Sequence, residues 1–502
     1  MKKILSALFL LLLIDPLHAQ TDADALRFSM LNYGSTARSL GMGNSFGALG
    51  ADASCLAMNP AGIGLYRRSE ASISPVFSNR SVGTTYLGTQ ASDDFFKLAF
   101  GNLGVVWADD DKRIAFGISY NRTNEFSSRY IAEGNNPDHS LLDSYREEIA
   151  SSLDPGLSPG MFYQANVSPE DLASFYPFDI NLAWNTFLID TIDIAGSPRY
   201  FTAVPFAGTL QRRVMETRGG SGEWDFTLGG KVNNNLYLGF TLGITSLRYV
   251  EESTWSEFDV KDTIPFFREF QYNQSLSTTG SGVNLKFGAI FRPSDYFRFG
   301  AAIHSPTWYT LVDEYTADMR ADLDNGDVYD DIGPAFIPFD YRVNTPLRFI
   351  GSAAFIFLQQ GAINIDYEFT DYGLARINPV DRSFRSDFIP LNQAIRLKYT
   401  STHAIRAGFE WRYETLRFRA GAFYTTSPFD VALRSSTATD MSQMGLTGGL
   451  GYRGDKYYFD VAYAWSKIGS FIRPYTLEEE DVEGITFDQR DNRVMFTAGY
   501  FF

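Results

Sequence analysis

Cysteine is almost absent from this 502-residue chain, in which Cys55 is the single example. One cysteine cannot form an internal disulfide, so the fold must hold without cross-links, and no group of cysteines is present to bind a metal. Histidine is also scarce. Besides His18, which lies in the leader discussed below, the chain has only His139, His304 and His403.

Catalytic and metal-binding motifs are missing as well. The sequence contains no Gly-x-Ser-x-Gly, no His-Glu-x-x-His and no Walker-type loop. The acidic run from Asp322 to Asp331 has the composition of a calcium loop, but Gly326 is one place early and Gly333 stands where the bidentate glutamate belongs. We therefore expect no enzymatic activity, no cofactor and no metal. The net charge of −16 also argues against a nucleic acid as a partner.

Long apolar runs are confined to the first residues. Lys2 and Lys3 form a positive start, an apolar run of eleven residues follows from Ile4 to Ile14, and Ala19 offers a small residue for cleavage. A spanning helix needs about 20 apolar residues, so this run is typical of a secretory signal peptide, which we place at residues 1–19. No later segment is long and apolar enough for a helical membrane protein.

The chain is rich in aromatic residues and glycine, with 43 Phe, 28 Tyr and 43 Gly. Apolar residues stand at every second position of its clearest segment: Leu236, Leu238, Phe240, Leu242 and Ile244 alternate with Tyr237, Gly239, Thr241, Gly243 and Thr245. A period of two over this length predicts a strand with one apolar face and one small or polar face. About ten such residues, tilted, cross an apolar band about 25 Å tall.

The same alternation recurs near residues 114–120, 297–304, 363–369, 405–412 and 457–466, and the chain closes on Val494, Phe496, Ala498, Tyr500 and Phe502. Short turns are expected near 108–112, 233–235, 293–295, 358–360, 413–414 and 453–455. Long excursions are expected near 79–96, 131–205, 259–266, 319–340, 372–400, 428–440 and 468–490. This arrangement predicts an all-β fold, a 14-stranded antiparallel transmembrane β-barrel with long extracellular loops. A water-soluble sandwich would also alternate, but its second face would carry glycine and charge less often.

A block rich in glycine and alanine separates the leader from the first strand. It includes Arg38-Ser39-Leu40-Gly41-Met42-Gly43 and ends with Asn59-Pro60-Ala61-Gly62. The block has too much glycine for a stable helix and does not alternate as a strand would. It fits either a compact plug inside the barrel or a flexible linker, and its small residues favour the plug.

This block resembles the N-terminal hatch of the FadL-type outer-membrane transporters, in the form common in Bacteroidetes. The resemblance is specific over the hatch motif and looser over the strand count. It implies a hatch over residues 20–66, a barrel over residues 67–502, and hatch or gating roles for Gly41, Gly43, Asn59, Pro60, Ala61 and Gly62. It further implies passive uptake of long-chain fatty acids or other small hydrophobic compounds across the outer membrane of a Gram-negative bacterium. The family captures its substrate in an extracellular groove and releases it sideways at a kinked third strand.

Two regions are candidates for these steps. Asn121-Arg122-Thr123-Asn124 interrupts the alternation of the third strand, as either a lateral gate or an ordinary β-bulge. The long loop that follows carries large apolar residues, which form either the capture groove or a small core that holds the loop together. These residues are Leu172, Phe175, Tyr176, Phe178, Trp184 and Phe187.

Charged residues also fall on the face assigned to the lumen, namely Arg298, Arg348, Asp366, Glu368, Arg406, Arg417 and Arg419. They either brace the wall and hatch by ion pairs or leave an arginine free to receive a substrate carboxylate. The implied partners are hydrophobic small molecules, outer-membrane lipids and, through the terminal Phe502, the barrel assembly machinery. The alternatives are a FadL-like barrel that carries secreted proteins, as in type IX secretion, and a surface receptor.

Overall fold

The computed structural model describes residues 21–32, 35–108, 113–151, 163–194, 196–204, 208–335, 338–357, 360–430, 440–477 and 480–502. The signal peptide expected at residues 1–19 lies outside the described residues. None of the helices in the described part of the chain is long and apolar enough to cross a membrane.

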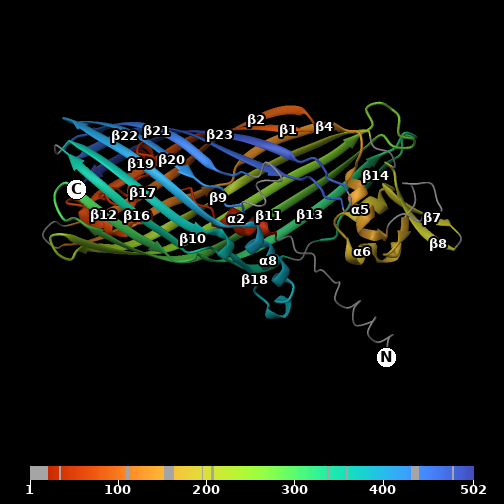
Figure 1. The fold of residues 1–502 in the computed structure, drawn as a ribbon, viewed down its shortest axis with the longest axis horizontal. Helices are drawn as coiled ribbons and strands as arrows, with labels where there is room; N and C mark the ends of the chain where they lie inside the picture. Colours follow the sequence, from red (N-terminus) through yellow and green to blue (C-terminus); the bar gives the residue numbers. More distant parts are fainter. Residues whose placement is uncertain are drawn as a thin grey trace.

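The wall is a closed antiparallel sheet, because the last strand pairs with the first (Figure 1). Several wall strands are interrupted and continue as a second segment. In order around the barrel they are β1 (Glu70–Tyr86), β2 (Thr89–Ala108), β3 (Ile114–Glu125) with β4 (Ser128–Asn136), β9 (Thr209–Lys231), β10 (Leu236–Phe258), β11 (Glu269–Phe291), β12 (Phe297–His304) with β13 (Trp308–Asp322), β15 (Phe339–Asn344) with β16 (Arg348–Phe357), β17 (Gly361–Asp371), β19 (Ser401–Tyr413), β20 (Leu416–Thr425), β21 (Gln443–Arg453), β22 (Tyr457–Ile472) and β23 (Ile485–Phe501). The predicted 14-stranded barrel is confirmed.

Side chains alternate between the two faces of this wall. On β10, Leu238 and Ile244 are exposed on the outside, whereas Thr241 and Thr245 are buried inside. Phe96, Leu98 and Phe100 of β2 and many residues of the other strands continue the exposed apolar belt. A closed wall that is apolar outside and polar inside is the arrangement of a transmembrane barrel.

The two ends of the barrel differ. Six short connections, between β2 and β3, β9 and β10, β11 and β12, β16 and β17, β19 and β20, and β21 and β22, lie at what we call the turn end. The C-terminus lies there too (Figure 1). The longer connections lie at the opposite, loop end. The short turns expected near 233–235, 293–295, 413–414 and 453–455 are present, whereas most residues of those expected near 108–112 and 358–360 lie outside the described residues.

The excursion expected near 79–96 is wrong. β1 and β2 stay paired as far as Tyr86 and Thr89, and Leu87 and Gly88 turn between them with φ of 47° and 77°. Two left-handed residues make the tight turn that the twist of a hairpin favours. Strand pairing also continues into other expected loops, to Asn136↔Thr209 and Ile472↔Ile485.

The loop end carries a folded cap between β4 and β9 (Figure 1). It contains α5 (Leu141–Ile149), η2 (Pro169–Asp171), α6 (Leu172–Phe175), α7 (Ile180–Asn185) and a small sheet of β5 (Ala150–Ser151), β6 (Tyr163–Ala165), β7 (Ile189–Ile194) and β8 (Ser197–Thr202). β14 (Val328–Ile332) forms a hairpin with β13 beside α7. Between β17 and β19 the chain forms η3 (Tyr372–Leu374), β18 (Arg376–Pro379), η4 (Arg382–Phe384) and α8 (Phe388–Lys398), which lie beside the barrel.

The N-terminal segment, residues 21–69, fills the lumen. It forms α2 (Asp22–Ser29), α3 (Ala37–Gly41), α4 (Cys55–Met58) and η1 (Pro60–Leu65), and most of its residues are buried. Wall glycines allow its backbone to approach the wall closely: a Cβ added at Gly239 would lie 2.2 Å from the Pro60 carbonyl, and one at Gly421 would lie 2.3 Å from the Gly43 nitrogen. The N-terminal segment thus packs directly against the polar inner face of the barrel.

The segment is also tied to the wall by hydrogen bonds. The N–H of Ala37 donates to Thr497 Oγ1 at 2.7 Å, and the N–H groups of Phe46 and Gly47 donate to Asp366 at 2.7 and 3.1 Å. Each of these bonds satisfies a buried peptide donor that the irregular segment cannot pair with itself.

The close approach at Gly239 gives a first prediction. Gly239→Val should displace Pro60 and η1 and lower the free energy of unfolding by roughly 1–3 kcal/mol, because the new side chain has no space. Thermal unfolding in detergent, together with protease accessibility of the N-terminal segment, measures this. Gly351→Val is the matched control, since an added Cβ at that outward position meets nothing within 4 Å. An equal loss in the control would contradict the argument.

Candidate functional site: a wall opening and a loop-end cavity

The third strand of the barrel is irregular where the sequence predicted it. The register between β3 and β9 shifts between Arg122 and Asn124, so Thr123 is an extra residue on β3. β3 ends at Glu125, and β4 begins only at Ser128. A bulge of this kind bends the strand and re-aims it.

The bend separates the third strand from its neighbour. β2 pairs with β3 from Ala108↔Ala115 to Asn102↔Asn121, and no pairing between β2 and β4 is present among the described residues. The edge of β2 from Thr89 to Gly101 therefore pairs with β1 alone. We call this interruption in the backbone pairing between β2 and the third strand the wall opening, with β4 packed close behind β2. Asn121 lies at the end of this opening nearer the turn end of the barrel. Its side chain accepts a hydrogen bond from Asn102 and donates one to Asp225, both at 2.7 Å.

β4 stays paired with β9 along its length but bends away from the edge of β2 toward the lumen. Inward-pointing side chains of β1, the strand beyond β2, bond to this part of the chain. Thr84 Oγ1 donates to the Ile131 carbonyl of β4 at 2.6 Å, and Arg80 donates to the carbonyl of Ser127, just before β4, at 3.0 Å. These contacts place β4 behind β2. They also replace part of the backbone pairing that β4 would have made in a regular wall.

The bulge is bonded to the N-terminal segment. The Thr123 carbonyl accepts from the N–H of Asn32 at 2.8 Å, and the Asn124 side chain donates to the Met30 carbonyl at 3.0 Å. The residues expected as a lateral gate therefore join the kinked strand to the segment expected as a hatch.

A small cavity of about 60 Å³ lies behind the wall opening. Its apolar lining includes Leu40 of the N-terminal segment, Phe95 and Met495. Its charged lining has four cations, Arg80, Lys97, Arg122 and Arg493, and two carboxylates, Glu125 and Asp491.

The two carboxylates are already engaged. Arg80 binds Asp491 at 2.7 Å, and Lys97 and Arg122 bind Glu125 at 2.6 and 2.7 Å. Arg493 has no carboxylate partner among the described residues, and its Nε is buried without a hydrogen bond. Arg493 therefore lies beside the wall opening without a direct ion pair, and its charge is offset only by that of Asp491, which Arg80 already binds.

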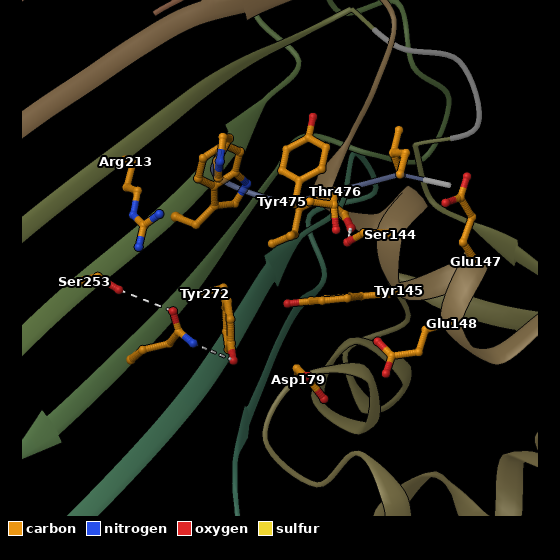
Figure 2. Close-up of a pocket in the computed structure, with 15 residues that line it drawn as sticks. Ser144, Tyr145, Glu147, Glu148, Asp179, Arg213, Ser253, Tyr272, Tyr475 and Thr476 are labelled. Carbon is orange, nitrogen blue, oxygen red and sulfur yellow. Dashed lines mark hydrogen bonds between the residues drawn. The ribbon is translucent and has the colours of Figure 1, made fainter. Parts of the chain in front are cut away.

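A cavity at the loop end has a volume of about 690 Å³ (Figure 2). Tyr145 of α5, Trp255 of β10, Tyr272 of β11 and Tyr475 form its aromatic walls. Its polar lining is Glu147, Glu148, Asp179, Arg213, Ser253 and Gln274. Figure 2 shows Ser253, Gln274 and Tyr272 joined in a chain, with bonds of 3.3 and 3.1 Å. The cavity lies where the cap meets the tops of the wall strands.

The apolar loop residues singled out in the sequence lie elsewhere. Leu172 and Phe178 are buried in the core of the cap, and Tyr176 and Trp184 pack against it. Phe175 and Phe187 are exposed, the latter with its ring 4.6 Å from that of Tyr329. None of the six lines the 690 Å³ cavity. Of the two interpretations, four of these positions fit the small core that holds the loop together.

The residues that do line the cavity were missed. The sequence carried a signal for two of them, because large aromatic residues stand beyond the part of each strand that the apolar belt occupies. These are Trp255 and Tyr272, which are directly opposite each other across β10 and β11. Tyr145 and Tyr475 come from segments that only the folded structure brings there.

The expected hatch residues contact either the wall or other residues of the N-terminal segment. The Asn59 side chain donates to the Gly47 carbonyl at 2.6 Å and accepts from the N–H of Ala61 at 3.2 Å, and Pro60 begins η1. Gly41 lies close to the backbone of Gly449, and Gly43 has a positive φ of 67°. Gly62 packs on Cys55 with no room for a Cβ. These contacts explain why small residues are required there.

Most of the predicted lumenal charges are paired. Glu368 binds both Arg348 and Arg406, and Arg419 binds Glu410 and Asp460, each at 2.7 Å. Asp366 accepts from the N-terminal segment, as described above. Arg298 and Arg417 bond only to backbone carbonyls. The interpretation as a bracing network therefore fits five of the seven residues.

Neither a protein-family model nor a curated protein matches the sequence. Among solved structures, a FadL homologue of Pseudomonas aeruginosa aligns with a TM-score of 0.53 and 14% identity, over 94% of this chain and 99% of that one. The P. putida toluene transporter TodX aligns with a TM-score of 0.51 and 11% identity, over 93% and 99%. These matches confirm a FadL-type barrel fold.

Asp179, in the loop-end cavity, gives a second prediction. Burial raises the pKa of this carboxyl to about 6, and Glu148 adds to the rise. A folded-state pKa above the ordinary value near 3.8 means that the wild-type protein loses stability as the pH rises from about 4 to about 7. Asp179→Asn should remove this loss and be more stable than wild type at neutral pH, by at most about 2 kcal/mol.

Thermal unfolding of the detergent-solubilised protein at about pH 4, 5.5 and 7 tests this. The stability difference between variant and wild type should grow across the series. Asp324→Asn, at an exposed turn, should show no such growth. A difference that is constant with pH would show that the Asp179 carboxyl is not the cause.

Proposed function

We propose that this protein is an outer-membrane channel of a Gram-negative bacterium for the passive uptake of long-chain fatty acids or other small hydrophobic compounds. The observation that carries the proposal is the wall opening. A transmembrane barrel normally pairs every strand along its length, because an unpaired backbone edge is costly in lipid. Where the pairing is interrupted, the two strands can separate without breaking backbone hydrogen bonds, and an apolar molecule can pass into the bilayer without crossing periplasmic water.

In this proposal the loop end faces outward and the turn end faces the periplasm. A substrate is captured at the loop end, where the 690 Å³ cavity lies between cap and wall. It then reaches the lumen and leaves between β2 and β4, with Asn121 to Asn124 as the gate.

The space behind the wall opening is too small for such a substrate, at about 60 Å³ against 300 Å³ or more in typical ligand sites. Leu40 lines it from the N-terminal segment. We propose that this segment acts as the hatch, with the glycines and Asn59-Pro60-Ala61 holding its closed form. Its bonds to Thr123 and Asn124 would couple its movement to the kinked strand.

Arg493 supports a substrate with an anionic head. Its guanidinium forms no direct ion pair among the described residues and lies beside an apolar lining, and a guanidinium fork matches a carboxylate. A fatty acid has this combination of groups. The toluene transporter, which has the same fold, is named for a neutral substrate, so the two classes can be separated by experiment.

Exposed aromatic residues at the loop end favour a second candidate function. Phe175 and Phe187 of the cap and Phe266 of the β10–β11 connection project from the surface beyond the apolar belt. They would suit a barrel that holds a secreted protein, or a surface receptor.

In either function we expect the barrel assembly machinery to recognise β23 through the terminal Phe502, which is exposed and stacks on Tyr500.

Filling the wall opening gives a third prediction. Ala99→Trp places a large side chain in the cavity behind the opening and should slow uptake of a labelled fatty acid roughly tenfold, equivalent to about 1.4 kcal/mol on the passage barrier. Ala353→Trp, at an exposed outward position, is the matched control. Uptake is measured in cells that lack their own channel, with heat-modifiable gel mobility as a check on folding. Equal uptake by both variants would exclude lateral release at this opening.

Arg493→Gln separates the substrate classes. If a carboxylate passes Arg493, fatty-acid uptake should fall severalfold while toluene uptake stays unchanged, because only the charged head loses a partner. A parallel fall for both would count against a carboxylate at Arg493.

Native mass spectrometry of the gently extracted protein addresses the second candidate function. A bound protein in place of a small amphiphile would favour a carrier of secreted proteins.

A further inference from the structure

The turn end of the barrel contains a large basic cavity, which we call the turn-end vestibule. Its volume is about 1130 Å³, and it lies between the N-terminal segment and the ends of the wall strands. Ten arginine and lysine side chains line it, against four carboxylates. This excess of positive charge stands out because the whole chain carries a net charge of −16.

The four carboxylates are already engaged. Glu410 binds Arg38 and Arg419, and Asp295 binds Arg292. Glu70 accepts from the Tyr458 hydroxyl at 2.6 Å, and Asp52 accepts from hydroxyl groups within the N-terminal segment. Arg453 also has a partner, since it binds Asp460 at 2.8 Å. The other seven vestibule cations form no ion pair among the described residues, and only the charges of Glu70 and Asp52 are left to offset them.

Several arginines bond only to backbone carbonyls. Arg298 donates to the Leu49 carbonyl at 2.8 Å, while its Nε is buried without a partner. Arg417 donates to the Glu414 and Leu416 carbonyls, and Arg68 donates to the Asp455 carbonyl. None of these three has a carboxylate within ion-pairing distance among the described residues. A carbonyl oxygen satisfies a donor but leaves the charge uncompensated.

Two of the arginines oppose each other directly. Arg412 of β19 and Arg417 of β20 are partners in the strand register, and both line the vestibule. Like charges at directly opposite positions destabilise a sheet. A pair that costs stability and lies in an open cavity is explained if an anion occupies the space between the cations.

We propose that the turn-end vestibule binds an acidic peptide segment of a periplasmic protein. The cations belong to the N-terminal segment, the β11–β12 turn and the β19–β20 hairpin, so they surround the cavity and do not converge on one point. A compact anion would reach only a few of them, whereas an extended row of carboxylates pairs with several guanidinium forks at once. The volume also exceeds the usual range for one small ligand, about 300–1,000 Å³. Only the assignment to the periplasm rests on the proposed function.

The test uses the full-length protein in a neutral detergent at low salt. A fluorescent peptide of about eight glutamates is titrated by fluorescence anisotropy, with a glutamine peptide of equal length as the negative probe. Arg412→Gln combined with Arg417→Gln should weaken binding about three- to tenfold, the effect expected for the loss of two exposed ion pairs. The matched control is Arg218→Gln combined with Arg320→Gln, which removes the same charge from exposed loop-end positions.

Binding that is lost in the first double variant and kept in the control supports the proposal. Absence of binding, or an equal loss in both double variants, overturns it. Inorganic phosphate should compete no better than chloride at equal ionic strength, and stronger competition would assign the vestibule to a compact anion instead. The assay involves no transport, so its outcome is independent of the uptake experiments.

Discussion

A lipid bilayer offers no hydrogen-bond partner to a peptide group, and the wall of this barrel depends on that constraint. The strands satisfy it by closing on themselves through β1 and β23. The edge of β2 beside the kinked third strand is the exception. Its neighbour β4 bends toward the lumen, where side chains of β1 donate hydrogen bonds to backbone carbonyls in and just before β4. A bulge and specific side-chain hydrogen bonds stabilise this break in the pairing. The break is therefore a defined part of the wall, and it is the basis for proposing lateral release.

The same constraint makes the lumen polar, because a closed wall that presents its apolar face to lipid must turn its polar face inward. The N-terminal segment covers that face, and it does so by backbone contact at glycines such as Gly239 and Gly421. Buried charges are matched across the interface, as in the contact of Arg38 with Glu410. The same segment is hydrogen-bonded to the bulge at Thr123, so plug and wall opening are in direct contact.

Charge is distributed unevenly along the barrel axis. The chain is acidic overall, yet the turn-end vestibule is basic, and the loop-end cavity combines carboxylates with aromatic walls. Each end therefore presents its own chemistry, and the apolar belt between them is the part in contact with lipid. The two ends are suited to different partners, which is why the uptake proposal and the peptide proposal can be tested separately.

The barrel class, the short turns and the irregular third strand could be predicted from the sequence, because a period of two and turn-forming residues are local signals. The glycine-rich plug could be predicted for a similar reason, since small residues indicate close approach wherever they lie. The cavity lining could not: Tyr145 and Tyr475 meet Trp255 only because distant segments pack together. The same holds for which arginines lack a carboxylate, since Arg38 and Glu410 are 372 residues apart. Local periodicity determined the wall, whereas the course of β4, the cavities and the charge pairing were decided by long-range packing.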